Sequence, residues 1–493
     1  MERSTQPMSP ASLHWFRDDL RLADNPALAA AVDHGPTLCL YILDEGRSRR
    51  PLGGASRWWL SRSLAALAKA LAARGGKLVL MRGDPAAIIP RIVETVGIDL
   101  VTWNRRYDAE SIALDSRLKA ELVAAGTKVE TFNAALLNEP WQVTTKTGDP
   151  VKVFTPYWRA ARERGDPPAP RPAPTRIMPL ELPAAIADEA SSLTGLGLEP
   201  SKPDWAGGLR KAWTPGEDSA AERLRDFLAG PLDGYGEGRN RPDYVSTSRL
   251  SPHLRFGEIG PRQIWHATLS AVESGEASAG SSDAEKFLSE IGWREFSYHL
   301  LFYNPGLATE NYNPKFDAFP WQRDDAALAA WQRGSTGYPI VDAGLRELWT
   351  TGWMHNRVRM IAASFLIKHL LIDWRQGEDW FWDTLVDADP ANNAASWQWV
   401  AGSGADAAPY YRIFNPVTQG LKFDPKGGYV RRWIPEIAGL DDALIHEPWK
   451  ADADALRRAG IVLGETYPQP IVDLDFGRRR ALDALAQTRS DET

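Results

Sequence analysis

Residues 351–360 read TGWMHNRVRM and residues 373–400 read DWRQGEDWFWDTLVDADPANNAASWQWV, and these two stretches decide what kind of fold the chain can adopt. On one helix, Trp353, Asn356 and Met360 would share a face. A core helix normally fills such a face with Leu, Ile or Val, because burying an unpaired amide or carboxylate costs about 1 to 3 kcal/mol. The pattern therefore predicts a helix that lines a space for a flat, polar group.

Length and composition limit the classes of protein that fit. A chain of 493 residues exceeds what one hydrophobic core usually supports, so we expect two domains. Cys39 is the single cysteine, which excludes an internal disulfide, and no Cys/His cluster has the spacing of a metal site. No apolar run approaches the roughly 18 residues of a membrane span, and the N-terminus lacks an apolar signal core. These features predict a cytoplasmic protein with no metal and no membrane partner.

Charge and aromatic content bear on partners. The net charge is -7, so any nucleic-acid site must be a local basic patch. The chain contains 21 tryptophans. Aromatic packing explains most of them, and the alternatives for individual positions are stacking on a planar ligand or nucleobase, or electron transfer.

The N-terminal part alternates short apolar runs with helical periodicity. Strands are expected at residues 12–16, 37–43, 77–81, 99–103 and 127–132, and helices at 25–32, 55–75, 84–97 and 108–126. Strands that alternate with helices predict a Rossmann-like parallel α/β domain covered on both faces. Neither GxGxxG after the first strand nor GxxxxGK[ST] occurs, so neither NAD nor a P-loop nucleotide is supported.

A change of composition marks the connection to the second domain. Residues 160–205 are rich in Pro, Ala and Ser, and long helical segments with Trp-rich faces follow from Pro215. The fold class is thus α/β plus all-α. We expect domain boundaries at 10–140 for the α/β domain, 141–213 for a linker, 214–480 for the helical domain and 481–493 for a polar tail.

Two further groups of residues in the helical half suggest chemistry. Tyr235 and the run Thr247, Ser248, Arg249, Leu250 and Ser251 precede a helix, where hydroxyls and free N–H groups bind anions such as a diphosphate. An ordinary N-cap is the simpler interpretation. Glu290, Trp293 and Arg294 have helical spacing, so the carboxylate and the ring could recognise one base. A surface Glu–Arg pair beside a core Trp explains them equally well.

Taken in order, these motifs resemble those of the photolyase/cryptochrome family. The matching segments are WFRDDLRLADNPAL, the segment from Thr247 to Glu258, EIGWREF, TGYPIVDAGLRELWTTGWMHNRVRM and DADPANNAASWQWVAGSGADAAPYYRIFNP. The resemblance covers nearly the whole chain, and several long motifs match in order. It implies an N-terminal α/β antenna domain and a C-terminal helical domain that binds FAD.

The resemblance also implies roles for single residues. FAD contacts are expected from Tyr235, Thr247, Ser248, Arg249, Leu250, Ser251, Glu290, Arg294, Asn356, Arg359, Asp387, Asp389 and Asn393. Arg359 and Asp387 would pair, and Asn393 would face flavin N5, where a neutral amide does not repel an anionic reduced flavin. The pocket for the damaged bases would be lined by Glu290, Trp293, Asn356, Met360 and Trp399. Electrons would reach the oxidised flavin through Trp321, Trp374 and Trp397. DNA contacts are expected from Arg239, Trp293, Arg294, Arg357, Trp399 and Arg412.

The implied function is light-dependent DNA repair, in which photoexcited reduced FAD donates an electron to a flipped-out cyclobutane pyrimidine dimer. Relatives that repair (6-4) photoproducts have histidine at the place of Asn356, so the cyclobutane dimer is the better substrate. His355 would point about 100° away from Asn356 and be packed or solvated.

Other expectations are less determined by the residues. A second antenna chromophore, a reduced folate such as methenyltetrahydrofolate or a deazaflavin, would sit in the α/β domain, with residues 104–108 at its border. The expected partner is UV-damaged DNA and the expected state is a monomer. The alternative function is a cryptochrome-type blue-light photoreceptor with the same fold and FAD, although such proteins often carry a long C-terminal extension and this chain ends in a short polar segment.

Overall fold

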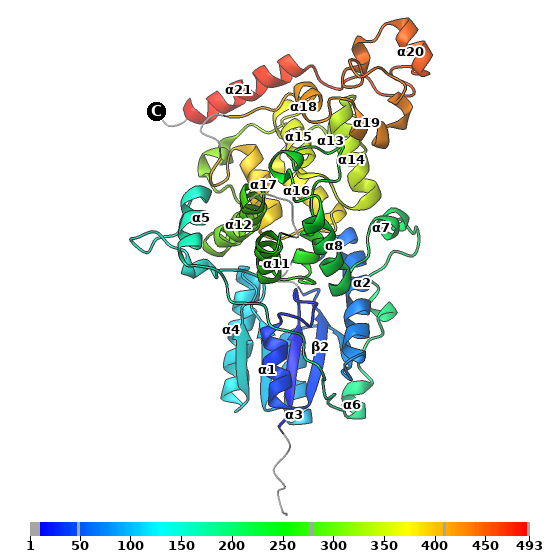
Figure 1. Ribbon diagram of the computed structural model, residues 1–493. Coiled ribbons are helices and arrows are strands. Elements are labelled where there is room, and N and C mark those ends of the chain that lie inside the picture. Colours follow the sequence, from blue (N-terminus) through cyan, green and yellow to red (C-terminus); the bar gives the residue numbers. More distant parts are fainter. Residues whose placement is uncertain (1–9, 47–49, 276–280, 408–410, 491–493) are drawn as a thin grey trace, which may run out of the picture.

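The computed structural model describes residues 10–46, 50–275, 281–407 and 411–490. Figure 1 shows two parts, a parallel sheet flanked by helices at the N-terminal end of the chain and a larger mass of helices that lies on one end of the sheet. Among the described residues, no helix is both long enough and apolar enough to cross a membrane.

The five expected strands are present. They are β1 (Ser12–Phe16), β2 (Thr37–Leu43), β3 (Leu78–Arg82), β4 (Leu100–Asn104) and β5 (Lys128–Phe132). All pairs are parallel and the order is β3-β2-β1-β4-β5. The order reverses between β1 and β4, so the loops after these two strands diverge and leave a crevice at their carboxyl ends.

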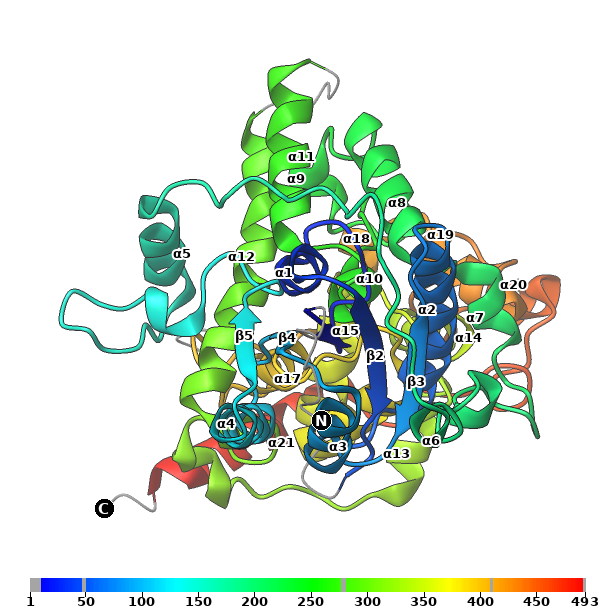
Figure 2. The same cartoon turned by 90° about the horizontal axis from the view of Figure 1, so that it is seen from below.

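Helices cover both faces of this sheet, as Figure 2 shows from below. They are α1 (Pro26–His34), α2 (Gly54–Ala72), α3 (Pro85–Val96) and α4 (Ala109–Ala124). Asn25, Asp84 and Asp108 cap the starts of α1, α3 and α4. The side-chain oxygen of each accepts a hydrogen bond from a backbone N–H in the first turn of its helix. One apolar cluster joins α1 and α2 to the sheet, and a second joins α3 and α4 to it, so burial on both faces explains the continuous apolar strands.

Residues 141–213 connect the two parts. They contain α5 (Phe154–Glu163), α6 (Ala184–Ala187), α7 (Gly207–Ala212) and the 3-10 turn Thr194–Leu196, and the 3-10 turn Pro140–Gln142 lies at their start. The proline-rich part lies on the α/β domain, because Thr37 donates to Met178 O at 2.8 Å and Asp24 donates to Arg171 O at 2.8 Å. Helix α5 packs on the helical part through Phe154 and Tyr157. The expected boundaries of the linker stay a prediction.

The rest of the chain is helical, as expected. The α-helices are α8 (Glu217–Ala229), α9 (Tyr235–Gly238), α10 (Ser251–Arg255), α11 (Pro261–Glu273), α12 (Ser281–Tyr303), α13 (Asp325–Gln332), α14 (Pro339–Thr351), α15 (Asn356–Ser364), α16 (Trp374–Thr384), α17 (Asn392–Ala401), α18 (Pro416–Phe423), α19 (Gly428–Trp433), α20 (Ala453–Ala459) and α21 (Leu474–Ser490). A π-helical turn spans Phe365–His369, and 3-10 turns span Pro305–Ala308, Pro314–Ala318, Pro435–Ile437 and Pro448–Lys450. Helix α21 continues through the boundary expected at residue 480, with Ala481 and Ala484 buried.

The expectation that Trp353, Asn356 and Met360 share one helix is wrong. Trp353 does not lie on a helix with Asn356 and Met360, because α14 ends at Thr351 and α15 begins only at Asn356. Gly352 ends α14 in the left-handed region, with a φ of 69°, and its N–H closes the last turn on Leu348 O. Asn356 and Met360 do share α15. Trp353 lies in the segment between the two helices and packs in the apolar cluster around α2.

The two parts share a core. The apolar cluster around α2 also contains Trp353 and Val386 from the helical part, together with Trp213 from the connecting residues. Gly53 lies so close to Trp382 that an added Cβ would fall 2.2 Å from the Trp382 carbonyl oxygen. The α/β domain is therefore packed firmly against the helices that carry the candidate site.

Candidate functional site

Arg249 lies at the centre of the first group of predicted residues. Its guanidinium carbon lies 4.5 Å from the centre of the Trp213 ring and 4.6 Å from that of Trp353. Its φ is 51°, a conformation that is costly for a residue with a Cβ. Helix α10 follows at Ser251 and has no side-chain cap, so the ordinary N-cap interpretation of the run from Thr247 to Ser251 is wrong.

Buried polar atoms next to Arg249 have no partner in the described part of the chain. These are Arg249 Nε and Asp387 Oδ1. The other Asp387 oxygen accepts a hydrogen bond of 2.8 Å from Arg359, which confirms the expected pair. Burial lowers the pKa of Arg249, although Glu347 and Asp387 oppose the shift. A buried guanidinium Nε and a buried carboxylate oxygen that lack partners fit a ligand with anionic and hydrogen-bonding groups, as the phosphates and ring of FAD provide.

Asn393 is held in one orientation by Glu378. Its Nδ2 donates to Glu378 Oε1 at 2.7 Å and to the Glu378 carbonyl oxygen at 3.1 Å. Arg50 Nη1, from the α/β domain, donates to both oxygens of the same carboxylate, at 2.9 and 2.8 Å. The donor group of Asn393 is thus occupied, and its Oδ1 is left to meet a donor from a ligand.

Asp389 has a local role in the structure. Its Oδ1 accepts the N–H groups of Ala391 and Asn392 at 2.9 and 2.8 Å, and its Oδ2 accepts the Tyr298 hydroxyl at 2.7 Å. These bonds shape the turn into α17, which carries Asn393 and Trp397. A direct contact of Asp389 with the cofactor stays a prediction.

The residues expected to line the lesion pocket come from three elements. On α15, exposed Asn356 lies beside Met360, with 4.0 Å between Nδ2 and Sδ. Trp293 on α12 stacks on Phe154 with 3.7 Å between ring centres, and Trp399 on α17 donates to Asp406 O at 3.0 Å. Trp293 and Trp399 pack on different apolar clusters, so each ring is fixed by its own support.

Glu290 and Arg294 point to different partners. Glu290 accepts both donor nitrogens of Arg239, one of them at 3.0 Å, and lies 3.3 Å from Lys286. Arg294 instead donates to Ala135 O of the α/β domain at 2.6 Å. The interpretation of Glu290 and Arg294 as a surface ion pair is therefore wrong. The predicted contacts of Arg294 with FAD and DNA stay predictions, and its observed contact joins the two domains.

Positive charge is concentrated around α15. The pKa of Arg357 is lowered mainly by burial, and repulsion from Arg239 and Arg412 lowers it further. Burial lowers the pKa of His355 to about 3, with further repulsion from Arg357, Arg359 and Arg239. His355 is the N-cap of α15 and accepts the Arg357 N–H, so it is a packed neutral residue. Several arginines that repel one another on one face form a local site for a polyanion.

The three tryptophans expected to carry electrons belong to one region of the core. Trp397 lies 5.0 Å from Phe381 between ring centres and 6.2 Å from Trp331. Trp374 is fully buried and donates to Asn311 Oδ1 at 3.0 Å. Trp321 is partly exposed and packs against the same cluster as the other two. Electron transfer along them stays a prediction.

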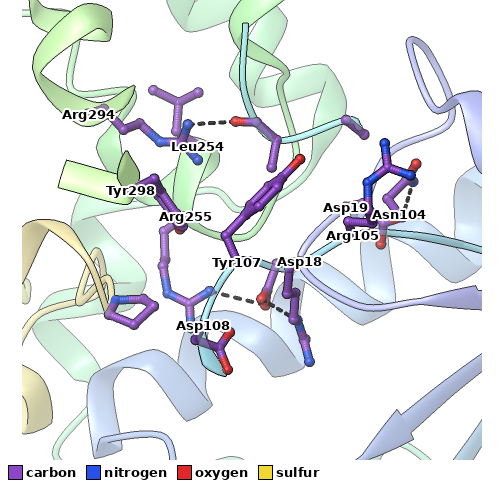
Figure 3. Close-up of a pocket in the computed structure, with 14 residues that line it drawn as sticks. Asp18, Asp19, Asn104, Arg105, Tyr107, Asp108, Leu254, Arg255, Arg294 and Tyr298 are labelled. Atoms are coloured by element: carbon purple, nitrogen blue, oxygen red, sulfur yellow. Dashed lines mark hydrogen bonds and ion pairs between the residues drawn. The ribbon is translucent and has the colours of Figure 1, made fainter. Parts of the chain in front are cut away.

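A small pocket lies between the domains at the carboxyl ends of β1 and β4 (Figure 3). Ion pairs line it, since Asp18 binds Arg106 at 2.7 Å and Arg255 at 3.1 Å. Its volume is about 30 Å³, enough for one or two water molecules and too small for a pterin or deazaflavin ring. That residues 104–108 border an antenna chromophore stays a prediction.

Comparisons with known proteins identify the family. Residues 12–175 match the model described as DNA photolyase, and residues 287–487 match the FAD binding domain of DNA photolyase. The chain is 52% identical to the deoxyribodipyrimidine photo-lyase of Agrobacterium fabrum over 96% of this chain and 97% of that protein. The chain belongs to the photolyase/cryptochrome family.

Two further similarities refine this assignment. The crystal structure of a bacterial class III photolyase from Agrobacterium tumefaciens superposes with a TM-score of 0.94 at 51% identity, covering 99% of this chain and all of that one. Cryptochrome-1 of Arabidopsis thaliana is 41% identical over 97% of this chain and 70% of that protein. The fold and the FAD-binding domain expected from the sequence are thus confirmed.

Some residues of the site could not be found from sequence patterns. Glu378 and Arg50 meet across 328 positions of the chain, and no local spacing indicates such a contact. Trp213 precedes the helical part and reads as ordinary packing. Its place beside Arg249 depends on the shared core of the two domains.

Proposed function

We propose that this protein is a deoxyribodipyrimidine photo-lyase, a light-dependent enzyme that splits cyclobutane pyrimidine dimers in UV-damaged DNA. The observation that carries the proposal is the adjacency of exposed Asn356 and Met360 to the positive face formed with Arg239 and Arg357. An amide and a thioether can contact the two linked pyrimidines, and the arginines can neutralise the flanking phosphates.

The bound FAD would supply the chemistry by giving one electron to the dimer under light. Arg249 and Asp387 would hold it, because they carry buried polar atoms that need partners. The Oδ1 of Asn393 would accept a hydrogen bond from the flavin ring, since Glu378 occupies the amide donor. The run from Thr247 to Ser251 and Tyr235 would surround the phosphates.

The site favours cyclobutane dimers over (6-4) photoproducts. Repair of the latter in this family uses histidine at the place of Asn356. His355 is the adjacent histidine, but its Nδ1 caps α15 and burial keeps it neutral above about pH 3. Proton transfer from His355 to a lesion is therefore not part of the proposal.

The remaining expectations complete the proposal. The enzyme acts as a monomer in the cytoplasm, and a second chromophore, a reduced folate or a deazaflavin, harvests light in the α/β domain. An absorption spectrum of the purified protein, compared with that of free FAD, tests for a second chromophore.

The experiment that tests the function is anaerobic repair by the purified, reduced protein under blue light. The substrates are a defined cyclobutane thymine dimer and a (6-4) photoproduct in otherwise identical duplexes, each with a dark control. We expect light-dependent loss of the cyclobutane lesion alone. No loss of either lesion by protein that binds and photoreduces FAD would instead favour a blue-light photoreceptor, in keeping with the similarity to a plant cryptochrome.

A further inference from the structure

Two apolar side chains project from the loop that joins α9 to α10. Tyr244 is 60% exposed and Val245 is 81% exposed, in a protein that buries most of its large apolar residues. Neither belongs to the groups of residues assigned above. We refer to residues 239–246 as the 239–246 loop.

This loop is ordered by its own hydrogen bonds. The N–H groups of Asn240 and Arg241 bind the carbonyls of Glu237 and Gly238 at 3.0 and 2.9 Å, and the Ser246 hydroxyl donates to Gly238 O at 2.5 Å. A ring presented on an ordered loop loses little conformational entropy when it binds a partner.

One arginine contacts the exposed ring, and a second lies beside the residue before it. The Arg241 guanidinium lies 4.4 Å from the centre of the Tyr244 ring, and its position is set by two hydrogen bonds to Asp243 at 2.9 and 2.5 Å. Arg432 on α19 donates to the Asp243 carbonyl oxygen at 3.4 Å. An aromatic ring among arginines is the arrangement with which proteins bind single-stranded nucleic acid.

The loop is attached to α12 and α15, two of the three helices that carry the expected lesion pocket. Arg239, at its start, forms the ion pair with Glu290 on α12. Arg357, next to Asn356 on α15, donates to Asn240 Oδ1 at 2.6 Å. The ring of Tyr244 is therefore held at the rim of the positive face where the proposed function places DNA.

We propose that Tyr244 stacks on an unpaired nucleobase near the dimer, either in a single strand or in the part of a duplex that opens when the dimer leaves it. The Arg241 guanidinium contacts the Tyr244 ring, and Val245 contacts the edge of the base. The inference rests on the proposed function, because it names a further contact of the same DNA site. It assigns Tyr244 to substrate binding, with no part in the electron transfer.

The expected effect follows from the strength of stacking. Base–aromatic stacking is worth about 1 to 3 kcal/mol per base, which corresponds to about a fivefold to 150-fold change in affinity. Loss of the ring should therefore raise the KM for repair and the Kd for dimer-containing DNA, with a much smaller change in kcat. An unpaired base is needed, so undamaged duplex should be bound almost as before.

The test compares Tyr244→Ala, Tyr244→Phe and Phe476→Ala in the full-length, FAD-loaded protein. Phe476 on α21 is a matched control, because it is 51% exposed and has Arg480 5.2 Å from its ring centre. Fluorescence anisotropy gives the Kd for dimer-containing single strands, dimer-containing duplex and undamaged duplex. We expect that Tyr244→Ala alone binds the dimer-containing single strand and the dimer-containing duplex more weakly. Tyr244→Phe keeps the ring and should bind nearly as the unaltered protein does.

Three results would overturn the inference. They are unchanged binding by Tyr244→Ala, an equal loss on undamaged duplex, or the same loss in Phe476→Ala. Thermal unfolding of each variant separates a binding defect from loss of structure, and Tyr244→Phe repeats the test with the fold preserved. If the unaltered protein neither binds nor repairs dimer-containing DNA, the proposed function fails, which is distinct from failure of the Tyr244 contact.

Discussion

The side-chain amide of Asn393 donates hydrogen bonds to both the carboxylate and the carbonyl oxygen of Glu378, at 2.7 and 3.1 Å. Because both acceptors are oxygens, the amide cannot turn its Oδ1 towards them without losing these bonds. The orientation of the group expected to face the flavin is thus set by a neighbour on α16, and through Arg50 by the α/β domain.

Asn393→Asp should lower stability and change the flavin potential. A carboxylate beside Glu378 repels it, and burial already raises the pKa of Glu378. Repulsion between the two carboxylates raises the folded-state pKa of the introduced carboxyl group and of Glu378 further. The folded protein is therefore destabilised at pH 7.5, where both groups are ionised in the unfolded chain, and the destabilisation is relieved as the pH falls. We expect a loss of about 1 to 3 kcal/mol at pH 7.5, measured by urea unfolding at pH 7.5 and 5.5.

The double variant Asn393→Asp/Glu378→Gln separates the two effects. It should recover much of the stability, because the repulsion is gone, while reduced anionic flavin stays less favoured than in the unaltered protein. An unchanged reduction potential in Asn393→Asp would remove the role of the amide beside the flavin.

Arg249→Lys should weaken FAD binding. Lysine keeps the charge and the same backbone strain at a φ of 51°, but it loses the planar group that lies between Trp213 and Trp353. We expect the Kd for FAD to rise about tenfold, from a loss of about 1 to 2 kcal/mol. Flavin fluorescence during reconstitution measures it. Arg223→Lys is the control, since Arg223 lies 5.2 Å from the Trp213 ring; an equal loss there would show that charge near Trp213, rather than the stacked Arg249, matters.

Trp397→Phe should stop photoreduction and spare repair by chemically reduced protein. Trp397 packs so tightly that a Cβ on Gly377 would lie 2.1 Å from it, so we also expect a stability loss of about 1 to 2 kcal/mol. Trp331→Phe changes a buried ring 6.2 Å from Trp397 that lies outside the proposed electron path. Absorption changes under blue light, followed by repair assays with dithionite-reduced protein, distinguish the two variants. Loss of repair by prereduced Trp397→Phe would contradict the separation of photoreduction from repair.

His355→Asn should make the protein less sensitive to acid. Burial lowers the pKa of His355 from its ordinary 6.5 to about 3, so the unfolded chain binds a proton that the folded chain does not. Stability from this residue is present above pH 6.5 and is lost as the pH falls towards 3, amounting to about 2 kcal/mol at pH 5. Asparagine also caps helices well, so stability at pH 7.5 should change by less than about 1 kcal/mol.

Urea unfolding of His355→Asn at pH 7.5 and pH 5 checks this. His266→Gln, a partly buried histidine bonded to Pro167 O, serves as the control. Parallel loss of stability in His355→Asn and the unaltered protein would show that His355 does not titrate as its burial indicates.

The sequence by itself determined the strands, the parallel sheet and the change to a helical second half. These follow from local patterns, since apolar runs, caps such as Asn25 and Asp108, and helical periodicity act over a few residues. The pairing of Arg359 with Asp387 was also expected and is present, because the family motifs carry both residues.

Only the tertiary structure decided which partners the polar side chains choose. Trp353 leaves the helix because Gly352 ends α14, Arg294 turns to Ala135 instead of Glu290, and Asn393 is oriented by Glu378. Glu378 in turn binds Arg50, far away in the chain. Such contacts depend on the packing of two domains against one another. A hydrogen bond is decided by distance and angle in space, and spacing along the chain does not contain that information.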